Sequence, residues 1–365
     1  MGFSALDHQH MARALQLAEQ GLSTTTPNPR VGCVIARGDT VVGEGWHRRA
    51  GEAHAEVHAL QVAGAHAQGA TAYVTLEPCA HHGRTPPCAD ALIAAKVARV
   101  VIAMGDPNPL VAGQGIARLE QAGIPTQVGL LSAEAAELNI GFISRMTRSR
   151  PWVRLKAATT LDGKTALNNG VSQWITGSAA RADGHRWRAR ACAILTGLGT
   201  VRADDPLLTV RDAPCSRQPL RVLVDARFEV STDARLFNGD PVLVVTAISN
   251  PEKAAALAAR NVDTLQLPNA HGKVDLPALL EALAQRGINE LHVEAGFKLN
   301  GSLLRENCVD ELLLYTAPML VGDAAQGLFD LPELSSLEKA RHLEWRDVRL
   351  IGKDVRLIGR FQRAG

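Results

Sequence analysis

Four residues near the start of the chain have side chains that could bind a metal ion and activate water. His54 and Glu56 lie in the stretch HAEVH, and Cys79 and Cys88 lie in LEPCAHHGRTPPCADAL. One imidazole and two thiolates would leave the fourth position of a tetrahedral zinc ion open for water. Zinc lowers the pKa of bound water to about 7, and Glu56 could then carry protons. These residues therefore predict a zinc-dependent hydrolytic site.

Other histidines nearby leave alternative ligand sets open. His58 follows His54 by four positions and faces the same side of a helix, although a supporting or surface role fits it better. His81 or His82 could complete a structural site with four protein ligands. That alternative leaves Glu56 without a purpose, so the catalytic interpretation is preferred.

The six cysteines are scattered along a chain that is too long for a disulfide scaffold. In a reducing compartment, paired thiols such as Cys79 and Cys88 are more often metal-binding or catalytic than bridged. A disulfide between them is therefore the weaker alternative. Isolated cysteines are typical of small buried apolar positions, and this interpretation is applied to Cys33, Cys192 and Cys308.

The elements that must position these residues can be read from hydrophobic spacing. Residues 54–67 predict a helix that begins at His54, and residues 71–76 predict a strand that ends shortly before Cys79. Residues 89–95 predict a short helix directly after Cys88. Both cysteines therefore lie near helix starts, where the helix dipole favours a thiolate.

The order of these pieces is similar to the His-x-Glu…Pro-Cys…Cys signature of the zinc nucleobase deaminases. In that chemistry Glu56 takes a proton from the zinc-activated water and gives it to the departing ammonia. The signature has two residues between its cysteines, whereas eight separate Cys79 from Cys88. The longer spacing predicts an inserted loop at the rim of the site.

Length and composition indicate a globular protein rather than a nucleic-acid or membrane protein. The 365 residues suggest about two domains, and the net charge is only +2 with 4% aromatic residues. Nucleic-acid binders usually combine a basic face with stacking rings. No apolar run reaches the roughly 18 residues that a membrane helix needs, and the N-terminus lacks the features of a signal peptide. Leu6 stands where a myristoylation signal needs Ser or Thr. We expect a cytoplasmic protein.

Helical and strand patterns alternate along both halves of the chain, which predicts two layered α/β domains that meet near Arg150 and Pro151. The expected domains are residues 1–147 and 151–365. Further helices are expected at 8–22, 115–121, from 132, 178–190, 251–259, 277–285 and 299–306. Further strands are expected at 31–36, 40–46, 99–104, 126–131, 153–157, 193–196, 221–225, 242–246, 290–294 and 311–316.

Motifs along nearly the whole chain resemble those of the bifunctional deaminase–reductases of riboflavin biosynthesis. The first half carries TTPNPRVGCVI, RAGEAHAEVHAL and TLEPCAHHGRTPPCADALI, and the second half carries RPWVRLKAATTLDGKTA, SQWITG, ILTGLGTVRADDPLLTVR and VEAGFKLNGSLL. The resemblance implies a cytidine-deaminase-like α/β/α layered domain followed by a dihydrofolate-reductase-like α/β domain. It also implies Zn²⁺, NADPH and a homo-oligomer, with a dimer through the reductase halves as the expected form.

Two consecutive reactions on a small phosphoribosyl pyrimidine are implied by the same resemblance. Water first replaces the 2-amino group of 2,5-diamino-6-(5-phosphoribosylamino)pyrimidin-4(3H)-one. NADPH then reduces the ribosyl group of 5-amino-6-(5-phosphoribosylamino)uracil to ribityl. In the first reaction, the substrate contacts implied by the resemblance are Asn28, His47, His81 and Arg84.

For the second reaction, the resemblance implies one set of residues for NADPH and another for the substrate. The NADPH contacts are Ala158, Trp174, Thr200, Asp204, Gly296, Phe297, Lys298, Leu299, Asn300, Gly301 and Ser302. The substrate contacts are Ser172, Arg188, Leu208, Arg211 and Glu294. Lys156 is a further possible contact.

The residues by themselves indicate a nicotinamide site only weakly. The stretch GLGTVR has Arg202 in place of the third glycine of the dinucleotide-binding pattern. A strand that ends at Glu294, a turn at Gly296 and a following helix would present backbone amides to a pyrophosphate. Guanidinium groups match phosphate oxygens, which suits Arg188 and Arg211 to the substrate phosphate. Glu294 could bond sugar hydroxyls or steer a proton, and both roles remain open.

Two other functions compete with this interpretation. The zinc motif alone also permits a nucleic-acid deaminase such as a tRNA adenosine deaminase, although charge, aromatic content and the long inserted loop oppose it. A zinc-stabilised scaffold without catalytic activity would leave Glu56 without a role.

Overall fold

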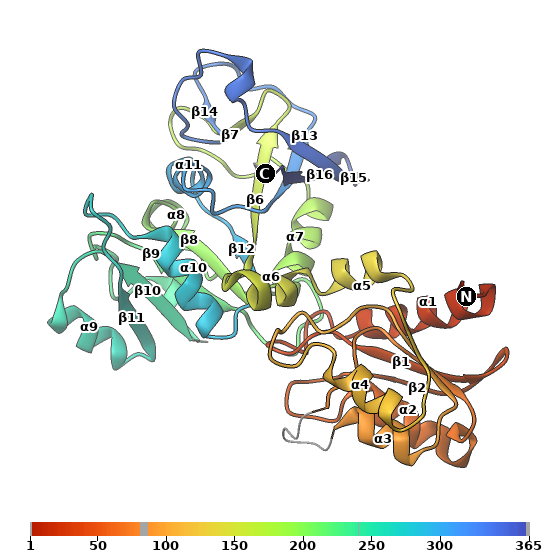
Figure 1. Cartoon of the computed structure of the whole chain (residues 1–365). Coiled ribbons are helices and arrows are strands. Elements are labelled where there is room, and N and C mark those ends of the chain that lie inside the picture. Colours follow the sequence, from red (N-terminus) through yellow and green to blue (C-terminus); the bar gives the residue numbers. More distant parts are fainter. Residues whose placement is uncertain (1, 81–86, 240, 363–365) are drawn as a thin grey trace. The chain divides into compact units, whose positions relative to one another are not determined.

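The helices and strands fall into two units, Met1–Ser149 and Arg150–Gly365 (Figure 1). The computed structural model describes residues 2–80, 87–239 and 241–362. Each unit contains its own β-sheet and its own hydrophobic core.

A five-stranded sheet in the order β2-β1-β3-β4-β5 forms the centre of the N-terminal unit. β1 (Gly32–Arg37) and β2 (Thr40–Trp46) coincide with two expected strands, 31–36 and 40–46, and pair with each other antiparallel. β3 (Thr71–Val74) pairs antiparallel with β1. β4 (Arg99–Ile102) and β5 (Thr126–Val128) continue the sheet parallel to β3.

Helices cover both faces of this sheet because its strands are apolar on both faces. α1 (Ala5–Glu19) packs on the face that carries Val34, and α2 (Ala55–Ala63) packs on the face that carries Ile35 (Figure 1). Adjacent residues of a strand point to opposite faces, so these two neighbours belong to separate cores. The result is the predicted α/β/α layering. The other helices are α3 (Cys88–Ala94), α4 (Gln114–Gln121), α5 (Ser132–Leu138) and α6 (Ile140–Arg148), with a 3-10 turn at Gly64–Ala67.

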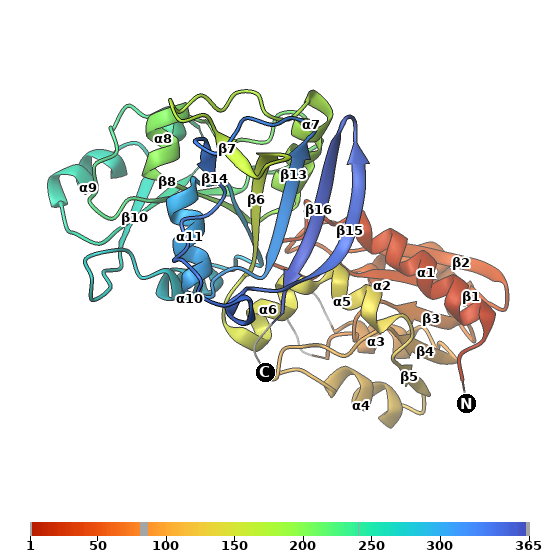
Figure 2. The ribbon, with the colours of Figure 1, turned by 90° about the horizontal axis from the view of Figure 1, so that it is seen from above.

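The C-terminal unit is built on a nine-stranded mixed sheet in the order β11-β10-β9-β8-β12-β6-β13-β16-β15. Its strands from β11 to β13 are parallel. β16 and β15 add an antiparallel edge beside β13 (Figure 2). The strands are β6 (Trp152–Thr160), β8 (Ala193–Gly197), β9 (Leu220–Val224), β10 (Val242–Thr246), β11 (Val262–Gln266), β12 (Glu290–Val293), β13 (Glu311–Ala317), β15 (Leu343–Ile351) and β16 (Asp354–Phe361). β7 (Lys164–Ala166) and β14 (Gln326–Gly327) form a separate two-stranded sheet.

Helices also cover both faces of this larger sheet. α10 (Leu276–Gln285) and α11 (Phe297–Arg305) belong to the core on the side of Leu195. α8 (Leu198–Asp204) and α9 (Pro251–Ala258) belong to the core on the side of Ile194. A further helix, α7 (Ser178–Arg190), packs its Ala180 and Trp187 against β13 and β16.

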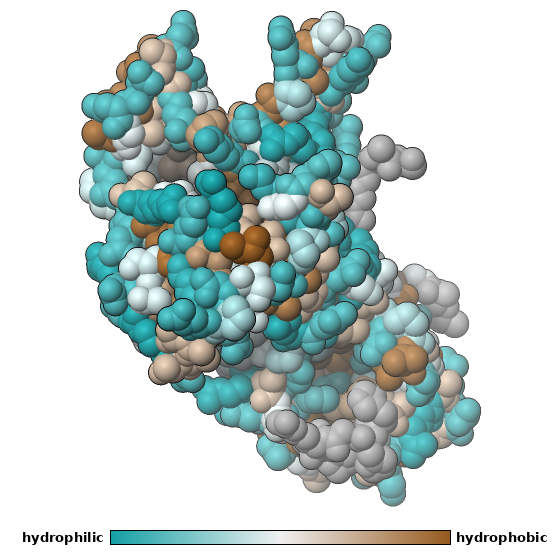
Figure 3. All heavy atoms as spheres, turned by 90° about the vertical axis from the view of Figure 1, so that its left-hand side faces the viewer, coloured by the Kyte–Doolittle hydropathy of each residue, from teal (hydrophilic) through white to brown (hydrophobic). Residues whose placement is uncertain are grey.

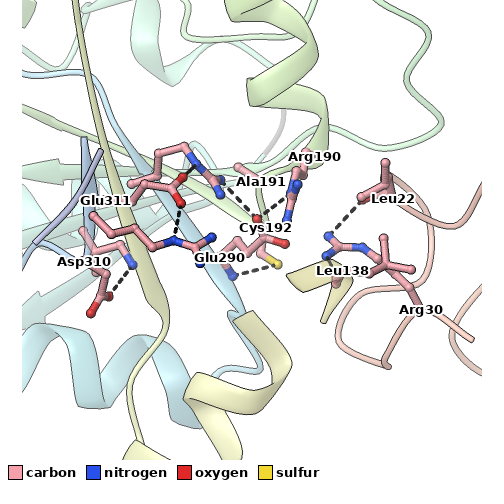
Figure 4. A network of polar contacts seen from close by, with 12 residues as sticks. Leu22, Arg30, Leu138, Arg190, Ala191, Cys192, Glu290, Asp310 and Glu311 are labelled. Atoms are coloured by element: carbon pink, nitrogen blue, oxygen red, sulfur yellow. Dashed lines mark hydrogen bonds and ion pairs between the residues drawn. The ribbon is translucent and has the colours of Figure 1, made fainter. Parts of the chain in front are cut away.

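A buried ion network ties the N-terminal ends of three neighbouring strands together. Arg154 on β6 is 2% exposed and forms ion pairs with Glu290 of β12 and Glu311 of β13. Arg190 at the end of α7 binds the same Glu290, and Figure 4 shows both glutamates and Arg190 from close by. The guanidinium of Arg154 also lies 4.4 Å from the centre of the Trp187 ring. The charges are paired, as buried charges must be, and the network fixes α7 on the sheet.

The sequence did not predict several elements of the C-terminal unit, namely α8, β7, β11, β14, β15 and β16. β15 and β16 are the largest omission. Charged residues interrupt β15 at almost every second position, and its Trp345, Val348 and Leu350 are more than half exposed. An edge strand with little burial on either face lacks the alternating apolar pattern that identifies a strand.

The surface shown in Figure 3 is mostly hydrophilic, with hydrophobic residues in small patches. Large apolar side chains are exposed at scattered positions such as Leu110, Leu320 and Leu337. Among the helices of the described residues, none combines the length and the apolarity needed to cross a membrane.

Candidate active sites

The predicted zinc ligands converge at one point of the N-terminal unit. One ligand atom from each of His54, Cys79 and Cys88 lies within 4.8 Å of the other two. The Nδ1 atom of His54 is 3.3 Å from the sulfur of Cys88 and 3.7 Å from that of Cys79. His54 is the N-cap of α2, Cys88 is the first residue of α3, and Cys79 follows β3. The donor set and its spacing fit a zinc ion with one position left open.

The two thiols are coupled electrostatically. Cys88 donates hydrogen bonds to the sulfur of Cys79 from its side chain and from its backbone N–H, the latter at 3.3 Å. This lowers the pKa of Cys79 to about 4, and the pKa of Cys88 rises because that thiol keeps the shared proton. The same thiolate raises the pKa of His54. A divalent cation in place of the proton would bind both sulfurs as thiolates.

Glu56 lies beside these ligands in a buried position. The side chain is 3% exposed, and its Oε2 atom has no hydrogen-bond partner among the residues that the structure describes. Burial raises the pKa of Glu56 to about 6, with His54 opposing the rise and the negative charge of Cys79 contributing to it. A buried carboxyl group with one unsatisfied oxygen can bind and release a proton near neutral pH.

Asn28 and His47, both predicted substrate contacts, are held rigidly near this centre. The Nε2 atom of His47 is 3.1 Å from the Nδ2 atom of Asn28, and its Nδ1 is 3.1 Å from the carbonyl of Ala53. His47 therefore donates through Nδ1 and accepts through Nε2. Its ring lies 5.2 Å from that of His54, edge to face.

The loop that carries Asn28 is anchored by Arg30. This side chain donates to the carbonyls of Leu138 at 2.7 Å and Leu22 at 3.1 Å (Figure 4). The backbone N–H of Arg30 donates to Asn139. Arg30 is buried, and it fixes the loop to Leu22 on one side and to residues 138–139 on the other.

Other residues of the predicted site stand apart from the metal cluster or outside the described residues. His58 is not part of the three-residue cluster, and burial lowers its pKa. His81, His82 and Arg84 lie outside the residues that the structure describes.

In the C-terminal unit, predicted substrate contacts gather at the end of β12. Arg188 of α7 binds Glu294 through two hydrogen bonds of 2.5 and 2.8 Å. Lys156 of β6 lies 3.9 Å from the same carboxylate. Burial alone would raise the pKa of Glu294, but the charges of Arg188 and Lys156 lower it well below its usual range. Two predicted substrate contacts therefore bind each other.

Two histidines next to these residues, His292 and His185, were not predicted from the sequence to belong to the site. His292 is fully buried, and its Nε2 lies 3.3 Å from an oxygen of Glu294. His292 and Glu294 are two residues apart, so in an extended chain their side chains point to the same face. This spacing could have indicated in the sequence that the two side chains lie together. His185 lies one turn before Arg188 on α7, and its Nδ1 accepts a hydrogen bond of 3.3 Å from the backbone N–H of Arg211.

The loop that contains Leu208 and Arg211 is held against α7. Arg188 donates to the carbonyl of Thr209 at 3.0 Å, and His185 binds the backbone of Arg211. Leu208 is buried, whereas Arg211 is exposed. The loop backbone is therefore fixed while one guanidinium remains accessible to an anion.

Two glycine-containing turns of this unit, at Gly197 and Gly296, meet at the ends of the adjacent strands β8 and β12. A Cβ atom on Gly197 would lie 3.0 Å from Leu299, and one on Gly296 would lie 3.8 Å from the hydroxyl of Thr200. Gly296 is the N-cap of α11, and the side chain of Asn300 donates to the carbonyl of Ala295. Thr200 and Gly296, both predicted NADPH contacts, thus lie side by side, and the predicted contact Leu299 lies against Gly197.

Further predicted contacts lie around the segment that precedes α7. The side chain of Gln173, between Ser172 and Trp174, donates to Asp204 at 3.3 Å. Trp174 is 68% exposed, so it does not serve as a core residue, and Arg181 lies 4.6 Å above its ring. Ala158 is the β6 residue paired with Tyr315 of β13.

Comparisons with known proteins match both units. Residues 4–104 match the cytidine and deoxycytidylate deaminase zinc-binding region, and residues 151–357 match the RibD C-terminal domain. The riboflavin biosynthesis protein RibD of Escherichia coli is 48% identical over 96% of this chain and 98% of its own length. The RibD of Haemophilus influenzae is 45% identical over 97% of each chain.

Solved structures agree over the whole length. RibD of Acinetobacter baumannii superposes with a TM-score of 0.90 at 43% identity, covering 98% of this chain and 99% of that one. A Thermotoga maritima diaminohydroxyphosphoribosylaminopyrimidine deaminase/5-amino-6-(5-phosphoribosylamino)uracil reductase superposes with a TM-score of 0.87 at 32% identity, with the same coverage. The chain therefore belongs to the RibD family of bifunctional riboflavin-biosynthesis enzymes, with a zinc-dependent deaminase domain followed by an NADPH-dependent reductase domain.

Proposed function

We propose that the expected N-terminal domain, residues 1–147, deaminates 2,5-diamino-6-(5-phosphoribosylamino)pyrimidin-4(3H)-one. Residues 151–365 then reduce the ribosyl group of the product, 5-amino-6-(5-phosphoribosylamino)uracil, to ribityl with NADPH. The observation that carries this proposal is the convergence of His54, Cys79 and Cys88 beside the buried Glu56, in a chain of this family.

In the first reaction, His54, Cys79 and Cys88 hold zinc and Glu56 moves the protons. Zinc bound there lowers the pKa of water towards about 7 and supplies a hydroxide nucleophile at neutral pH. Glu56 takes the proton that the water loses and transfers it to the amino group, which leaves as ammonia as its bond to carbon breaks. The unsatisfied Oε2 of Glu56 and its pKa of about 6 support this role.

Asn28 and His47 are proposed to orient the pyrimidine over this centre. Their mutual hydrogen bond and the anchored loop support a rigid contact surface, because neither side chain needs to be ordered when substrate binds. His81 and Arg84 are proposed to complete the contacts, with Arg84 binding the ribose phosphate through its guanidinium.

In the second reaction, NADPH supplies the hydride to the sugar C1′ carbon, and the protein positions the two reactants. The contact between Gly197 and Leu299 and the amides at the start of α11 support a cofactor site there. The proposed NADPH contacts are Ala158, Trp174, Thr200, Asp204 and residues 296–302.

Glu294 and its partners are proposed to bind the ribose. A lowered pKa keeps Glu294 a carboxylate, so it accepts hydrogen bonds from sugar hydroxyls. Arg188 uses three of its five N–H groups on Glu294 and Thr209, which leaves two for the substrate. The exposed Arg211 is therefore the stronger candidate for the phosphate. Ser172 and Leu208 are proposed as further substrate contacts.

A direct test is to incubate the purified protein with the diaminopyrimidine phosphate, with and without NADPH. Ammonia release is expected in both samples, and NADPH oxidation only after ammonia has formed. Structured RNA, supplied instead of the pyrimidine, is expected to release no ammonia. Turnover of RNA alone would overturn the proposal.

We also propose a cytoplasmic homodimer that forms through the C-terminal units. The six free thiols support a cytoplasmic protein, since disulfides are rare in that compartment. The dimer is supported by the exposed apolar side chains on the edge strand β15, which are Trp345, Val348 and Leu350. Light scattering is expected to give twice the mass of the chain, and Leu350→Asp is expected to shift that mass towards the monomer.

A further inference from the structure

Glu77, which lies two residues before the ligand Cys79, accepts an unusual number of backbone hydrogen bonds. One carboxylate oxygen accepts from the N–H groups of Asp106 at 3.1 Å and Gly113 at 3.0 Å. The other accepts from Gly115 at 2.9 Å and Ile116 at 3.3 Å. The side chain is 5% exposed. Four amides therefore converge on one buried carboxylate.

These amides belong to the loop before α4 and to the first turn of that helix. The first N–H groups of a helix have no partner within the helix, and α4 has no side-chain cap of its own at Gly113. Glu77 supplies the missing acceptor from a different part of the chain. A Cβ atom on Gly115 would lie only 1.8 Å from the carbonyl oxygen of Pro78. α4 is thus pressed directly against the residue before Cys79.

The same helix also contacts the segment that carries the second cysteine ligand. Arg118, one turn further along α4, forms an ion pair with Asp90, the third residue of α3. Cys88 is the first residue of α3. α4 therefore bridges the two cysteine segments, which are also joined by a hydrogen bond of 3.1 Å from Ala89 N–H to the carbonyl of Cys79.

We propose that Glu77 is a positioning residue for the zinc centre. By fixing the start of α4, it sets the separation of Cys79 and Cys88 through the Pro78 contact on one side and the Arg118–Asp90 pair on the other. The inference rests on the proposed ligand set. Glu77 would hold the metal ligands in place without touching the metal, as supporting residues do in other metal sites.

The test is Glu77→Gln in the full chain, with zinc release to a chromophoric chelator as the main measurement. Glutamine has the same size as glutamate, but its NH₂ group would replace one carboxylate oxygen and would face two backbone N–H donors without accepting from them. Zinc release is expected to accelerate about tenfold. This lies within the range seen when a residue that supports a metal ligand, without touching the metal, is changed. In the cobalt-substituted protein, the thiolate-to-cobalt absorption is expected to shift. NADPH oxidation with the deaminated substrate is expected to stay unchanged.

Glu120→Gln is the matched control, because it makes the same change on an exposed face of α4 and keeps an oxygen for its bond with Thr126. It is expected to leave zinc release unchanged. If Glu77→Gln lowers the melting temperature but leaves zinc release and the cobalt spectrum as in the parent, Glu77 is only structural and the proposal is wrong.

Two further variants keep the test decisive. If Glu77→Gln does not fold, Arg118→Ala decides, since its side chain is half exposed and its removal is tolerable. Faster zinc release from that variant supports the bridging role of α4, and unchanged release overturns it. His54→Ala tests the proposed zinc ligands separately from the role of Glu77. If zinc still binds to this variant, the ligand set itself is wrong.

Discussion

At the scale of single residues, the chemistry of the N-terminal unit depends on where the proton of one carboxyl group resides. Glu56 is buried beside the three metal-binding side chains, and its pKa is raised to about 6. This environment suits a group that must accept a proton from water and deliver it to ammonia at neutral pH.

Glu56→Gln is expected to lower the rate of ammonia release by at least about a hundredfold, because a glutamine cannot carry the proton. Zinc content, measured by metal analysis, is expected to remain at one ion per chain, and the reductase rate should be unchanged. Undiminished deamination by this variant would favour a scaffold role for the metal.

His185 is expected to make substrate binding in the reductase unit dependent on pH. Its Nδ1 must be unprotonated to accept from the backbone of Arg211, and its Nε2 lies 3.4 Å from Asp212. Burial lowers the pKa of His185, and the positive charges of Arg188 and Arg211 lower it further. The negative charges of Asp212 and Glu294 oppose this lowering.

Because burial lowers this pKa, the anchoring is still present at the ordinary histidine value of about 6.5 and is lost as pH falls through the lowered pKa. The KM for the deaminated substrate is expected to rise as pH falls through this lowered pKa. His185→Asn retains an acceptor near the Nδ1 position but cannot titrate, so its KM should vary less with pH. Equal pH profiles for the two proteins would contradict this role.

At the scale of elements, close backbone contacts position the helices that carry the proposed cofactor contacts. α11 lies so near residue 330 that a Cβ atom on Gly301 would be 2.1 Å from the carbonyl oxygen of Asp330. Asp330 N–H in turn donates to the carbonyl of Phe297 in the first turn of α11.

Gly301→Ala is expected to displace α11 and to destabilise the C-terminal unit by about 1–3 kcal/mol, as overpacking does. The KM for NADPH should rise, while ammonia release stays unchanged. Gly184→Ala on α7 is the matched control, since nothing lies within 4 Å of the added Cβ. Alanine is the better helix former, so this variant should be up to about 1 kcal/mol more stable in urea unfolding.

At the scale of the whole molecule, each unit contains the residues proposed for one reaction. The candidate metal ligands all belong to residues 1–149, and the Arg188–Glu294 pair belongs to residues 150–365. The two activities should therefore be separable by changes confined to one unit.

Removal of zinc by a chelator is expected to abolish ammonia release and to leave the oxidation of NADPH with the deaminated substrate intact. Arg188→Ala is expected to do the reverse, because it leaves the buried carboxylate of Glu294 without its strongest partner. The measurement is both rates on one preparation of each protein. Loss of both activities in either experiment would show that the units depend on each other.

Much of the architecture follows from local patterns. The strands with continuous apolar runs, such as β4 and β10, were predicted within a few residues because burial on both faces leaves a clear signal. β15 was missed because its side chains are largely exposed or charged, and β16 because charged residues that the fold buries, such as Asp354 and Arg356, interrupt its apolar pattern. The contact of Glu77 with α4 also escaped prediction, since a glutamate that caps a distant helix has no signature in its own neighbourhood.

The sequence by itself determined the metal-binding residue types, their order and the two-domain alternation, because zinc chemistry and hydrophobic periodicity both depend on spacing along the chain. Only the tertiary structure decided which groups bind each other. Arg188 was predicted as a phosphate ligand, yet it binds Glu294, which lies far away in the sequence and adjacent in the fold. Such pairs depend on which strand lies beside which helix, and that arrangement follows from packing of the whole sheet rather than from any single segment.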